Sequence, residues 1–327
     1  MQGSPELLEE KIRAKIFENF YGYVALFTPA QSSFLSDLYK RYNCLDSGSI
    51  VLHFAKKTHQ AILRQKEYDL NYDLSFEKFW HNHSLAQAEN TTIIDIAKNT
   101  NLPKETARRK LMELIKQKVF SKTKKNILWL PTDEYKKTYN ATIFNEIKQL
   151  AKLTKYITDK IDLNFSAEEI TNEYKKKFSF YWFHYLDLQL KWMKLWKHQI
   201  KDLEMVMIFM ELVNLLSSKA SRPVSHEELF TKPELINEPK EKNLNVSISA
   251  TSLSDITGIP RATCIRKLNQ MASKKMVIQD ENSKRYYIIP EALQKNMVSK
   301  ELTEKVSGLF SKFYFVTIKA LIAKNSH

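Results

Sequence analysis

The residues in this chain that are best suited to chemistry are basic, and they gather in two segments. Thr92–Thr132 holds eight Lys and two Arg against three acidic residues, a net charge of +7. Ser249–Pro290 holds four Lys and three Arg against three acidic residues, a net charge of +4. Together the two segments carry +11 of the formal +14 of the 327-residue chain. Clustered Lys and Arg neutralise phosphates, and Arg can also hydrogen-bond guanine, so this distribution predicts contact with nucleic acid.

Other kinds of chemical site have little support in the sequence. Five glycines argue against glycine-rich phosphate loops and dinucleotide-binding folds. Cys44 and Cys264 are too far apart in sequence to suggest a disulfide framework or a zinc site. The eight histidines offer no spacing better than His81-Asn82-His83, which is more typical of a helix end or surface than of a metal site. We therefore expect no enzyme, no metal and no cofactor.

The two basic segments share one sequence pattern. Placing Pro103 on Pro260 aligns them at an offset of 157, with seven identical residues over positions 96–120. The other six identities are Thr100/Thr257, Thr106/Thr263, Arg109/Arg266, Lys110/Lys267, Leu111/Leu268 and Lys118/Lys275. Apolar residues coincide as well, so we expect the two segments to share one local fold.

That fold must place the basic side chains on one surface. In each segment the pattern predicts a short helix, a tight turn, a second helix opened by a proline, and a β-hairpin with a polar tip. An apolar stripe at i, i+4 and i+7 gives the second helix one buried and one exposed face. Asn101 and Gly258 occupy the two turns, since both residue types tolerate the left-handed conformation. The expected elements are the helices Ile93–Asn99 and Ser252–Thr257, and the strand pairs Val119–Phe120 with Ile127–Leu130 and Met276–Ile278 with Tyr286–Ile289.

This pattern resembles the winged helix-turn-helix domains of bacterial transcription regulators. Residues 103–114, PKETARRKLMEL, resemble the recognition helix of the Crp/Fnr family, and MarR- and IclR-like domains share the looser Thr…Arg…Leu pattern. The resemblance covers the two basic segments only and implies a DNA-binding module in each. It implies base contacts from Lys104, Glu105 and Arg109 in the first copy, and from Arg261 and Arg266 in the second.

Two sets of candidate contacts follow from the resemblance and from the exposed helix faces. The candidates for base contacts are Lys104, Glu105, Arg108, Arg109, Arg261 and Arg266. The candidates for contacts with the DNA backbone are Thr106, Lys110, Lys122, Lys124, Lys125, Thr263, Lys267, Lys284 and Arg285. Cys264 aligns with Ala107 on the apolar stripe, which favours a small buried residue over a redox switch.

The remaining chain divides around these segments. We expect an N-terminal helical region (1–90), the first module (91–132), a second helical region (133–248), the second module (249–291) and C-terminal helices (292–327). Weaker matches at a similar offset favour a tandem duplication of halves 1–165 and 166–327. The residue pattern of Phe178–Leu216 predicts one or two aromatic-rich helices that pack in a core. The alternative is that their aromatic side chains line a cavity for an unidentified small-molecule effector. Ser218–Asn245 predicts an extended loop around a short helix that begins at a capping box, Ser225–Glu228.

The sequence thus predicts a mainly α protein with small β-hairpin wings that binds double-stranded DNA sequence-specifically. A cytoplasmic transcription regulator is the leading hypothesis, with two unlike modules acting as an intramolecular pseudo-dimer on an asymmetric site. It would be a monomer or a homodimer with no membrane association, because no uncharged apolar run approaches a membrane span. The first alternative is a plasmid-type replication initiator with tandem winged helices. The second is a protein-interaction scaffold, which a weak salt dependence of DNA affinity would favour.

Overall fold

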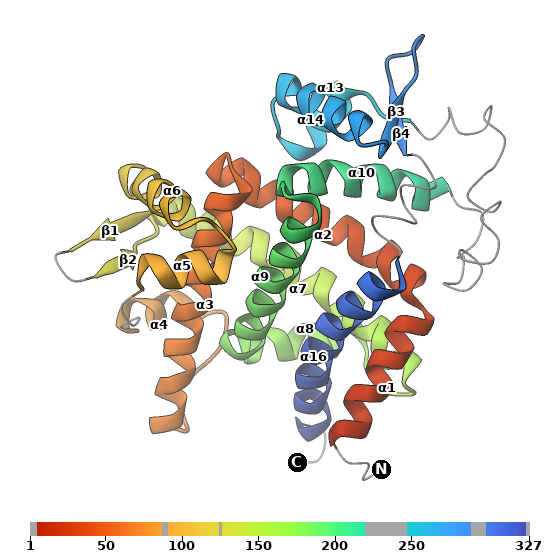
Figure 1. Ribbon diagram of the computed structural model, residues 1–327. Helices are drawn as coiled ribbons and strands as arrows, with labels where there is room; N and C mark the ends of the chain where they lie inside the picture. The colour runs from red at the N-terminus through yellow and green to blue at the C-terminus, as the bar shows by residue number, and fades with distance from the viewer. Residues whose placement is uncertain (1–4, 87–90, 124–125, 220–246, 289–298, 325–327) are drawn as a thin grey trace. The chain divides into compact units, whose positions relative to one another are not determined.

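The chain is mainly helical. The computed structural model describes residues 5–86, 91–123, 126–219, 247–288 and 299–324 (Figure 1). In those residues it forms thirteen helices and two separate two-stranded antiparallel hairpins. This confirms the predicted class, a mainly α fold with small β-hairpins.

The chain divides into two compact units, and each contains one basic segment. Unit 1 comprises Met1–Leu45 and Trp196–Lys312, and unit 2 comprises Asp46–Leu195 and Phe313–His327. Each unit therefore combines stretches that are far apart in sequence. The proposed duplication into contiguous halves concerns ancestry and stays a prediction.

Unit 1 is built around helix α10, which packs against α2 and carries the second basic segment. The five residues Met205–Phe209 of α10 are all buried, and so are Tyr23 and Phe27 of α2. Phe310 closes this core, with ring centroids 4.8 Å from Tyr23 and 4.7 Å from Phe27. The helices are α1 (Pro5–Glu18), α2 (Phe20–Tyr42), α10 (Leu203–Lys219), α13 (Ala250–Thr257), α14 (Arg261–Ser273) and the first half of α16 (Lys300–Lys324).

Unit 2 has an aromatic core that carries the first basic segment. Phe79 and Phe178 are fully buried and lie edge to face, with ring centroids 5.4 Å apart. Trp129 of the hairpin packs beside Trp80, at 5.9 Å between ring centroids. The helices are α3 (Leu45–Tyr68), α4 (Phe79–Leu85), α5 (Ile93–Thr100), α6 (Lys104–Lys116), α7 (Asp133–Lys160), α8 (Ala167–Lys176), α9 (Phe178–Ile200) and the end of α16.

The first basic segment folds as two short helices followed by a hairpin. A capping box between Thr92 and Asp95 begins α5, because each satisfies a backbone N–H of the other. Asn101 ends α5 in the left-handed conformation, with φ of 54°. Helix α6 follows, and strand β1 (Phe120–Lys122) then pairs antiparallel with β2 (Ile127–Trp129).

The second basic segment has the same order of elements. Ser249 caps α13, which ends at Gly258 with φ of 77°. A side chain there would be strained, and its Cβ would lie 2.8 Å from Cγ of Lys40. Helix α14 follows, then strands β3 (Val277–Gln279) and β4 (Tyr286–Ile288) pair antiparallel.

The two segments contain corresponding backbone hydrogen bonds, between residues related by the predicted offset of 157. The amide of Val119 donates to the carbonyl of Leu114 at 3.0 Å, and that of Met276 donates to Met271 at 2.9 Å. Lys118 and Lys275 both take positive φ, 60° and 55°, where the second helix turns into the first strand. The sequence alignment therefore corresponds to a shared local backbone geometry.

A few predicted boundaries were off by one or two residues. Pro103 and Pro260 are the N-cap residues of α6 and α14 and stand one position before the first helical residue. Val119 and Met276 precede their strands because each amide still bonds the preceding helix. Three predictions lie outside the described residues: the capping box Ser225–Glu228, most of the 218–245 loop, and Lys124 with Lys125.

The aromatic-rich stretch forms two helices, α9 and α10, with Lys201 at φ of 70° between them. Trp182, Trp192 and Trp196 are all at least 96% buried, which supports the interpretation of this stretch as core. In a separate feature, α16 is long and apolar enough by composition to cross a membrane, although half of its most apolar window is buried against the protein. Core helices of water-soluble proteins share those properties.

Candidate nucleic-acid interface

Helix α6 presents the predicted base-contact residues on one outward face. Lys104, Glu105, Arg108 and Arg109 are all exposed. The opposite side of the helix is buried and consists of Ala107, Leu111 and Leu114. The i, i+4, i+7 stripe therefore holds the helix to unit 2 and turns its charges toward solvent.

Two ion pairs run along that outward face. Nε of Arg108 lies 3.0 Å from Glu105, and a guanidinium nitrogen of Arg109 lies 2.8 Å from Glu113. All four side chains are 47 to 72% exposed. Exposed pairs of this kind contribute little net free energy, so both arginines can exchange these carboxylates for another acceptor at small cost. Glu113 was not among the sequence candidates, although its i+4 spacing from Arg109 indicated the pair.

The candidate backbone contacts of the first segment lie around this helix. Thr106 and Lys110 are half-buried beside its outward face. Lys122 is exposed at the end of β1 and leads into the hairpin tip. Lys124 and Lys125, which would stand on that tip, fall outside the described residues.

Helix α14 divides into two faces in the same way. Arg261 and Arg266 are exposed, and Thr263 is half-buried. Cys264 is completely buried and its thiol donates to the carbonyl oxygen of Ile259, at 3.4 Å. The expected small buried residue is confirmed, and burial raises the pKa of the Cys264 thiol. Nε of Arg261 donates to the hydroxyl of Thr251 at 3.1 Å, which links α14 to the start of α13.

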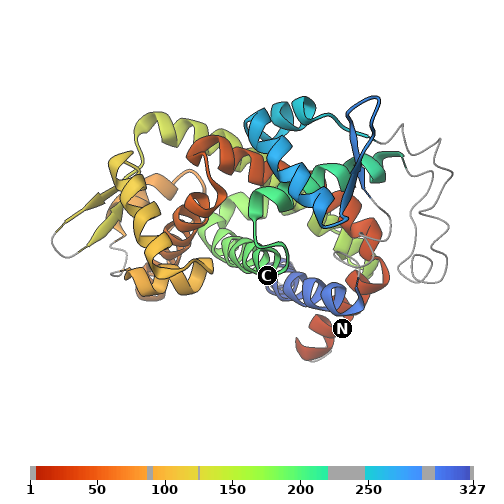
Figure 2. The same cartoon turned by 45° about the horizontal axis from the view of Figure 1, so that its top comes forward.

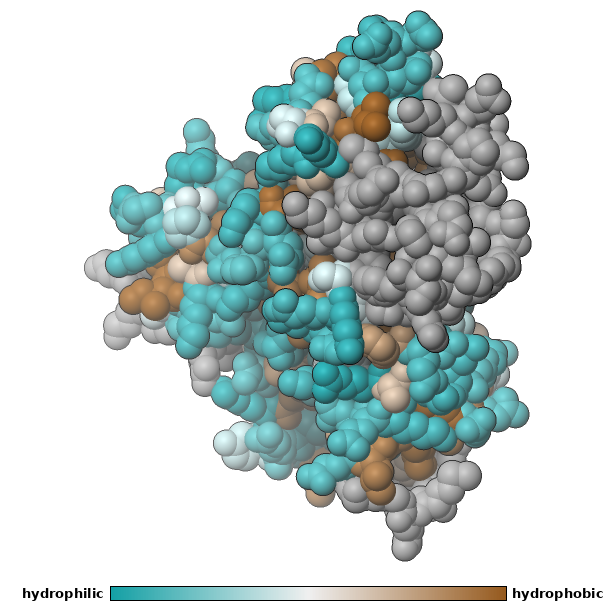
Figure 3. Space-filling view, turned by 45° about the vertical axis from the view of Figure 1, so that its right-hand side comes forward, coloured by the Kyte–Doolittle hydropathy of each residue, from teal (hydrophilic) through white to brown (hydrophobic). Residues whose placement is uncertain are grey.

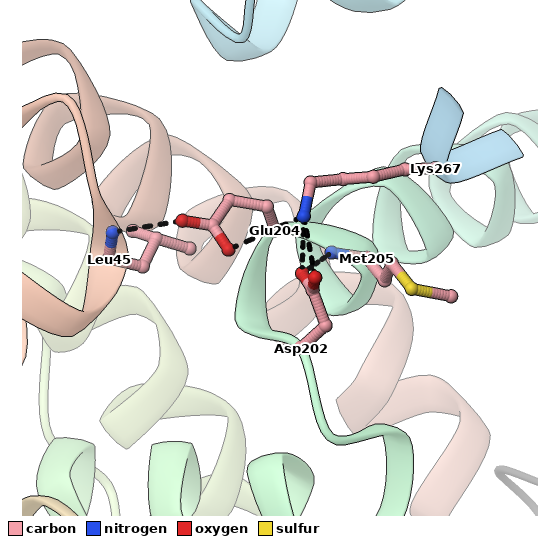
Figure 4. Close-up of polar contacts among 5 residues, drawn as sticks. All are labelled: Leu45, Asp202, Glu204, Met205 and Lys267. Atoms are coloured by element: carbon pink, nitrogen blue, oxygen red, sulfur yellow. Dashed lines mark hydrogen bonds and ion pairs between the residues drawn. The ribbon is translucent and has the colours of Figure 1, made fainter. Parts of the chain in front are cut away.

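Lys267 is not on the outward face, contrary to its assignment as a contact to the DNA backbone. It is 5% exposed, and Nζ lies 2.6 and 2.8 Å from the two carboxylate oxygens of Asp202 (Figure 4). A second carboxylate, that of Glu204, lies 3.7 Å away. The physical reason is the acidic N-terminus of α10, which packs under α14 and supplies the counter-charges. Figure 2 also shows α14 lying beside α10.

The two carboxylates of this cluster differ in their protonation equilibria. Burial favours the protonated form of Asp202, but hydrogen bonds from Lys267 and from the amide of Met205 outweigh it and lower the pKa of Asp202. Burial and the neighbouring Asp202 charge raise the pKa of Glu204. One oxygen of Glu204 accepts the amide of Leu45 at 3.2 Å. The cluster therefore joins α14, the start of α10 and Leu45, all within unit 1.

The second hairpin differs from the first in charge. Its turn is closed by the carboxylate of Asp280, which accepts the amide and hydroxyl of Ser283 at 2.6 and 2.7 Å. Glu281 is exposed beside it, and Lys284 is exposed with φ of 55°. The tip is thus of mixed charge, and among the described residues the ammonium group of Lys284 forms no hydrogen bond or ion pair.

Arg285, another predicted backbone contact, has a structural partner. Its guanidinium donates to the hydroxyl and carbonyl oxygens of Ser247, at 3.0 and 2.5 Å. Ile248, the next residue, forms an antiparallel bridge with Tyr286. Arg285 therefore fixes an additional edge of the hairpin, and a contact with DNA would have to compete with this role.

Several exposed cations were not on the list of candidates. Lys116 and Lys118 continue the outward face of α6 toward the hairpin, and Lys274 and Lys275 do the same after α14. Their spacing after the apolar stripe could have identified them. In the view of Figure 3 the second basic segment, at the top, presents mainly hydrophilic residues. By contrast, Asp202 and Glu204 lie far from Lys267 in sequence and carried no signal of their partnership.

The two basic segments thus share a backbone geometry, display basic side chains on their second helices and differ in how those helices are anchored. Among the described residues no three His, Cys, Asp or Glu side chains gather as a metal site would require. Comparison of the chain with protein-family models, with curated proteins and with solved structures gives no match.

Proposed function

We propose that this protein binds double-stranded DNA sequence-specifically and acts as a transcription regulator. In this proposal each basic segment is a winged helix-turn-helix module. Helices α6 and α14 enter the major groove, and the hairpins contact the flanking backbone.

The observation that carries the proposal is the display of cations on α6. Lys104, Arg108 and Arg109 stand together on the exposed face, while the apolar face of the same helix is buried. An α-helix fits the major groove, and Arg can bind guanine O6 and N7 with two hydrogen bonds. The α6 face therefore has both the shape and the donors that base readout needs.

The hairpin and the end of α6 would supply the sequence-independent part of the affinity. Lys116, Lys118 and Lys122 are exposed between α6 and the hairpin tip. Phosphate contacts of this kind position a protein on DNA without reading its sequence. With five or more phosphates neutralised in all, the logarithm of the affinity should fall by about 4 or more per tenfold rise in salt.

The experiment that tests the proposal is a titration of fluorescent duplex DNA at several salt concentrations, followed by selection of binding sites from random duplexes. We expect nanomolar to micromolar affinity at low salt, a steep salt dependence and an enriched sequence. A control variant, Lys152→Ala, removes an exposed lysine of α7 that lies outside both segments, and it should bind like the unchanged protein. No detectable binding to duplex DNA at low salt would refute the proposal.

The two modules are expected to read different half-sites. Lys104 and Glu105 of α6 correspond to Arg261 and Ala262 of α14, so the exposed side chains at matching positions differ. An intramolecular pseudo-dimer of such modules would select an asymmetric site. A selected site that is a strict inverted repeat would contradict this part of the proposal.

A further inference from the structure

The outward face of α14 has at its centre a residue that the candidate contacts do not include. Asn269 is exposed and follows Ala262 by seven residues, about two turns at ~3.6 residues per turn. The two therefore lie one above the other along the helix. Arg266 and Ile265 flank this line on either side, at about 60° and 40° from Asn269 at ~100° per residue.

The same position in α6 holds a different kind of side chain. At the offset of 157, Met112 corresponds to Asn269 and Glu105 corresponds to Ala262. Met112 is 49% exposed on a face otherwise made of charged residues. About half of this flexible apolar side chain is therefore in contact with water.

The buried cluster at Lys267 sets which way Asn269 points. Lys267 precedes Asn269 by two residues, so the two side chains leave the helix on nearly opposite sides, about 160° apart. Because Lys267 is held by Asp202 at 2.6 and 2.8 Å, α14 cannot rotate about its axis without breaking a buried ion pair. Asn269 is therefore held at the centre of the face that points away from α10.

Ala262 adds to the reach of Asn269. A methyl group at the centre of the first turn lets the helix approach a surface more closely than a longer side chain would. The amide of Asn269 has no hydrogen-bond partner among the described residues. It is therefore free to pair with a base edge, at no cost in broken internal bonds.

We propose that Asn269 and Met112 determine which base each module selects at one matching position, adenine for α14 and thymine for α6. The inference rests on the proposed DNA-binding function. The side-chain amide of an asparagine can form two hydrogen bonds with adenine. Its N–H₂ group donates to N7, and its carbonyl oxygen accepts from the N6 amino group. An apolar side chain instead contacts the C5 methyl group of thymine.

The test is selection of binding sites from random duplex DNA by the full chain and by two exchange variants, Asn269→Met and Met112→Asn. We expect Asn269→Met to change the selected base from adenine to thymine at one position of its half-site, and Met112→Asn to make the reverse change in the other half-site. In titrations, the Asn269→Met variant should bind the original duplex about 5- to 150-fold more weakly, the range of one bidentate base contact.

A matched control separates base readout from general charge and folding effects. Lys274→Ala removes an exposed cation just after α14 and should weaken binding to all duplexes alike, with the selected sequence unchanged. Circular dichroism should show every variant folded, since the exchanged side chains are exposed. An exchange of selected bases cannot result from a purely structural role of Asn269.

Two different negative results separate this inference from the function on which it rests. If the unchanged protein selects a DNA sequence and Asn269→Met selects the same one, the inference is wrong and DNA binding stands. If the unchanged protein binds no duplex DNA, both fail.

Discussion

Replacing His59 with phenylalanine should make unit 2 less sensitive to acid. His59 is completely buried, its ring stacks on Phe79 at 4.7 Å between centroids, and Phe178 lies edge-on at 5.3 Å. Neither ring nitrogen has a hydrogen-bond partner among the described residues. Burial, with a smaller contribution from the nearby His83, lowers the pKa of His59 to about 3.

The size of the effect follows from the difference between the folded and unfolded states. An unfolded histidine binds a proton near pH 6.5, whereas folded His59 does so only near pH 3. Above pH 6.5 both states are neutral and the histidine contributes nothing to the pH dependence. Between these values the unfolded state holds one more proton, so the free energy of unfolding falls by about 1.4 kcal/mol for each pH unit of acidification. From pH 7 to pH 5 the loss is about 2 kcal/mol.

Three further histidines of unit 2, His53, His83 and His184, act in the same direction. Burial lowers the pKa of both His53 and His83 to about 4. With His59, they would remove about 6 kcal/mol between pH 7 and pH 5, which is comparable to the whole stability of an ordinary domain. We therefore expect unit 2 to lose stability in mild acid, and His59→Phe to reduce the loss between pH 7 and pH 5 by about 2 kcal/mol.

The assay is urea unfolding at pH 7, 6 and 5, followed by tryptophan fluorescence. The comparison is between the pH-dependent losses within each variant, so any change in stability at pH 7 does not affect it. His81→Phe is the matched control because His81 is exposed on α4, and it should lose as much stability as the unchanged protein. Equal losses for His59→Phe and the unchanged protein would refute the reasoning, since His59 would then titrate alike in both states.

Three further predictions concern the two basic segments. Lys267→Met should lower the free energy of unfolding by up to about 3 kcal/mol in urea titrations, because it leaves two partly buried carboxylates without their counter-charge. Adding Asp202→Asn should restore part of this loss, and a loss below about 1 kcal/mol would contradict the structural role of the ion pair. Arg109→Ala should cost about 1 to 3 kcal/mol of binding to the selected duplex and broaden its sequence, whereas Lys122→Ala should weaken all duplexes alike; the reverse pattern in binding titrations would refute the assigned roles. Cys264 should resist alkylation by iodoacetamide in the folded protein and react only in urea, as followed by mass spectrometry; rapid labelling without urea would show that its site opens easily.

The local structure of the basic segments could be predicted because its causes are local. Asn101 and Gly258 tolerate positive φ, and each ends a helix in that conformation. Thr92 and Ser249 can cap a helix with a side-chain oxygen, and both do so. Such signals act over three or four residues, so one sequence window contains the whole interaction.

The bonds that tie down Lys267 and Arg285 could not be predicted because their partners come from another part of the chain. Lys267 lies in a segment that the sequence predicts to be basic surface, and its partner Asp202 is 65 residues away. Arg285 likewise pairs with Ser247, 38 residues away. A net charge counted along a segment includes such residues, although Lys267 is buried and the exposed Arg285 is hydrogen-bonded to Ser247. The count of +4 therefore overstates the charge that the second segment can offer to DNA.

The identical residues Lys110 and Lys267 show how the surrounding frame creates a difference between the modules. They occupy the same position in matching helices, so the local sequence predicts the same exposure for both side chains. Lys110 is half-buried, whereas Lys267 is enclosed by the acidic start of α10. In the second module this lysine is therefore removed from the surface and instead fixes α14 to the start of α10. If DNA binding is confirmed, we expect the first module, with its net charge of +7 against +4, to supply more of the salt-dependent affinity.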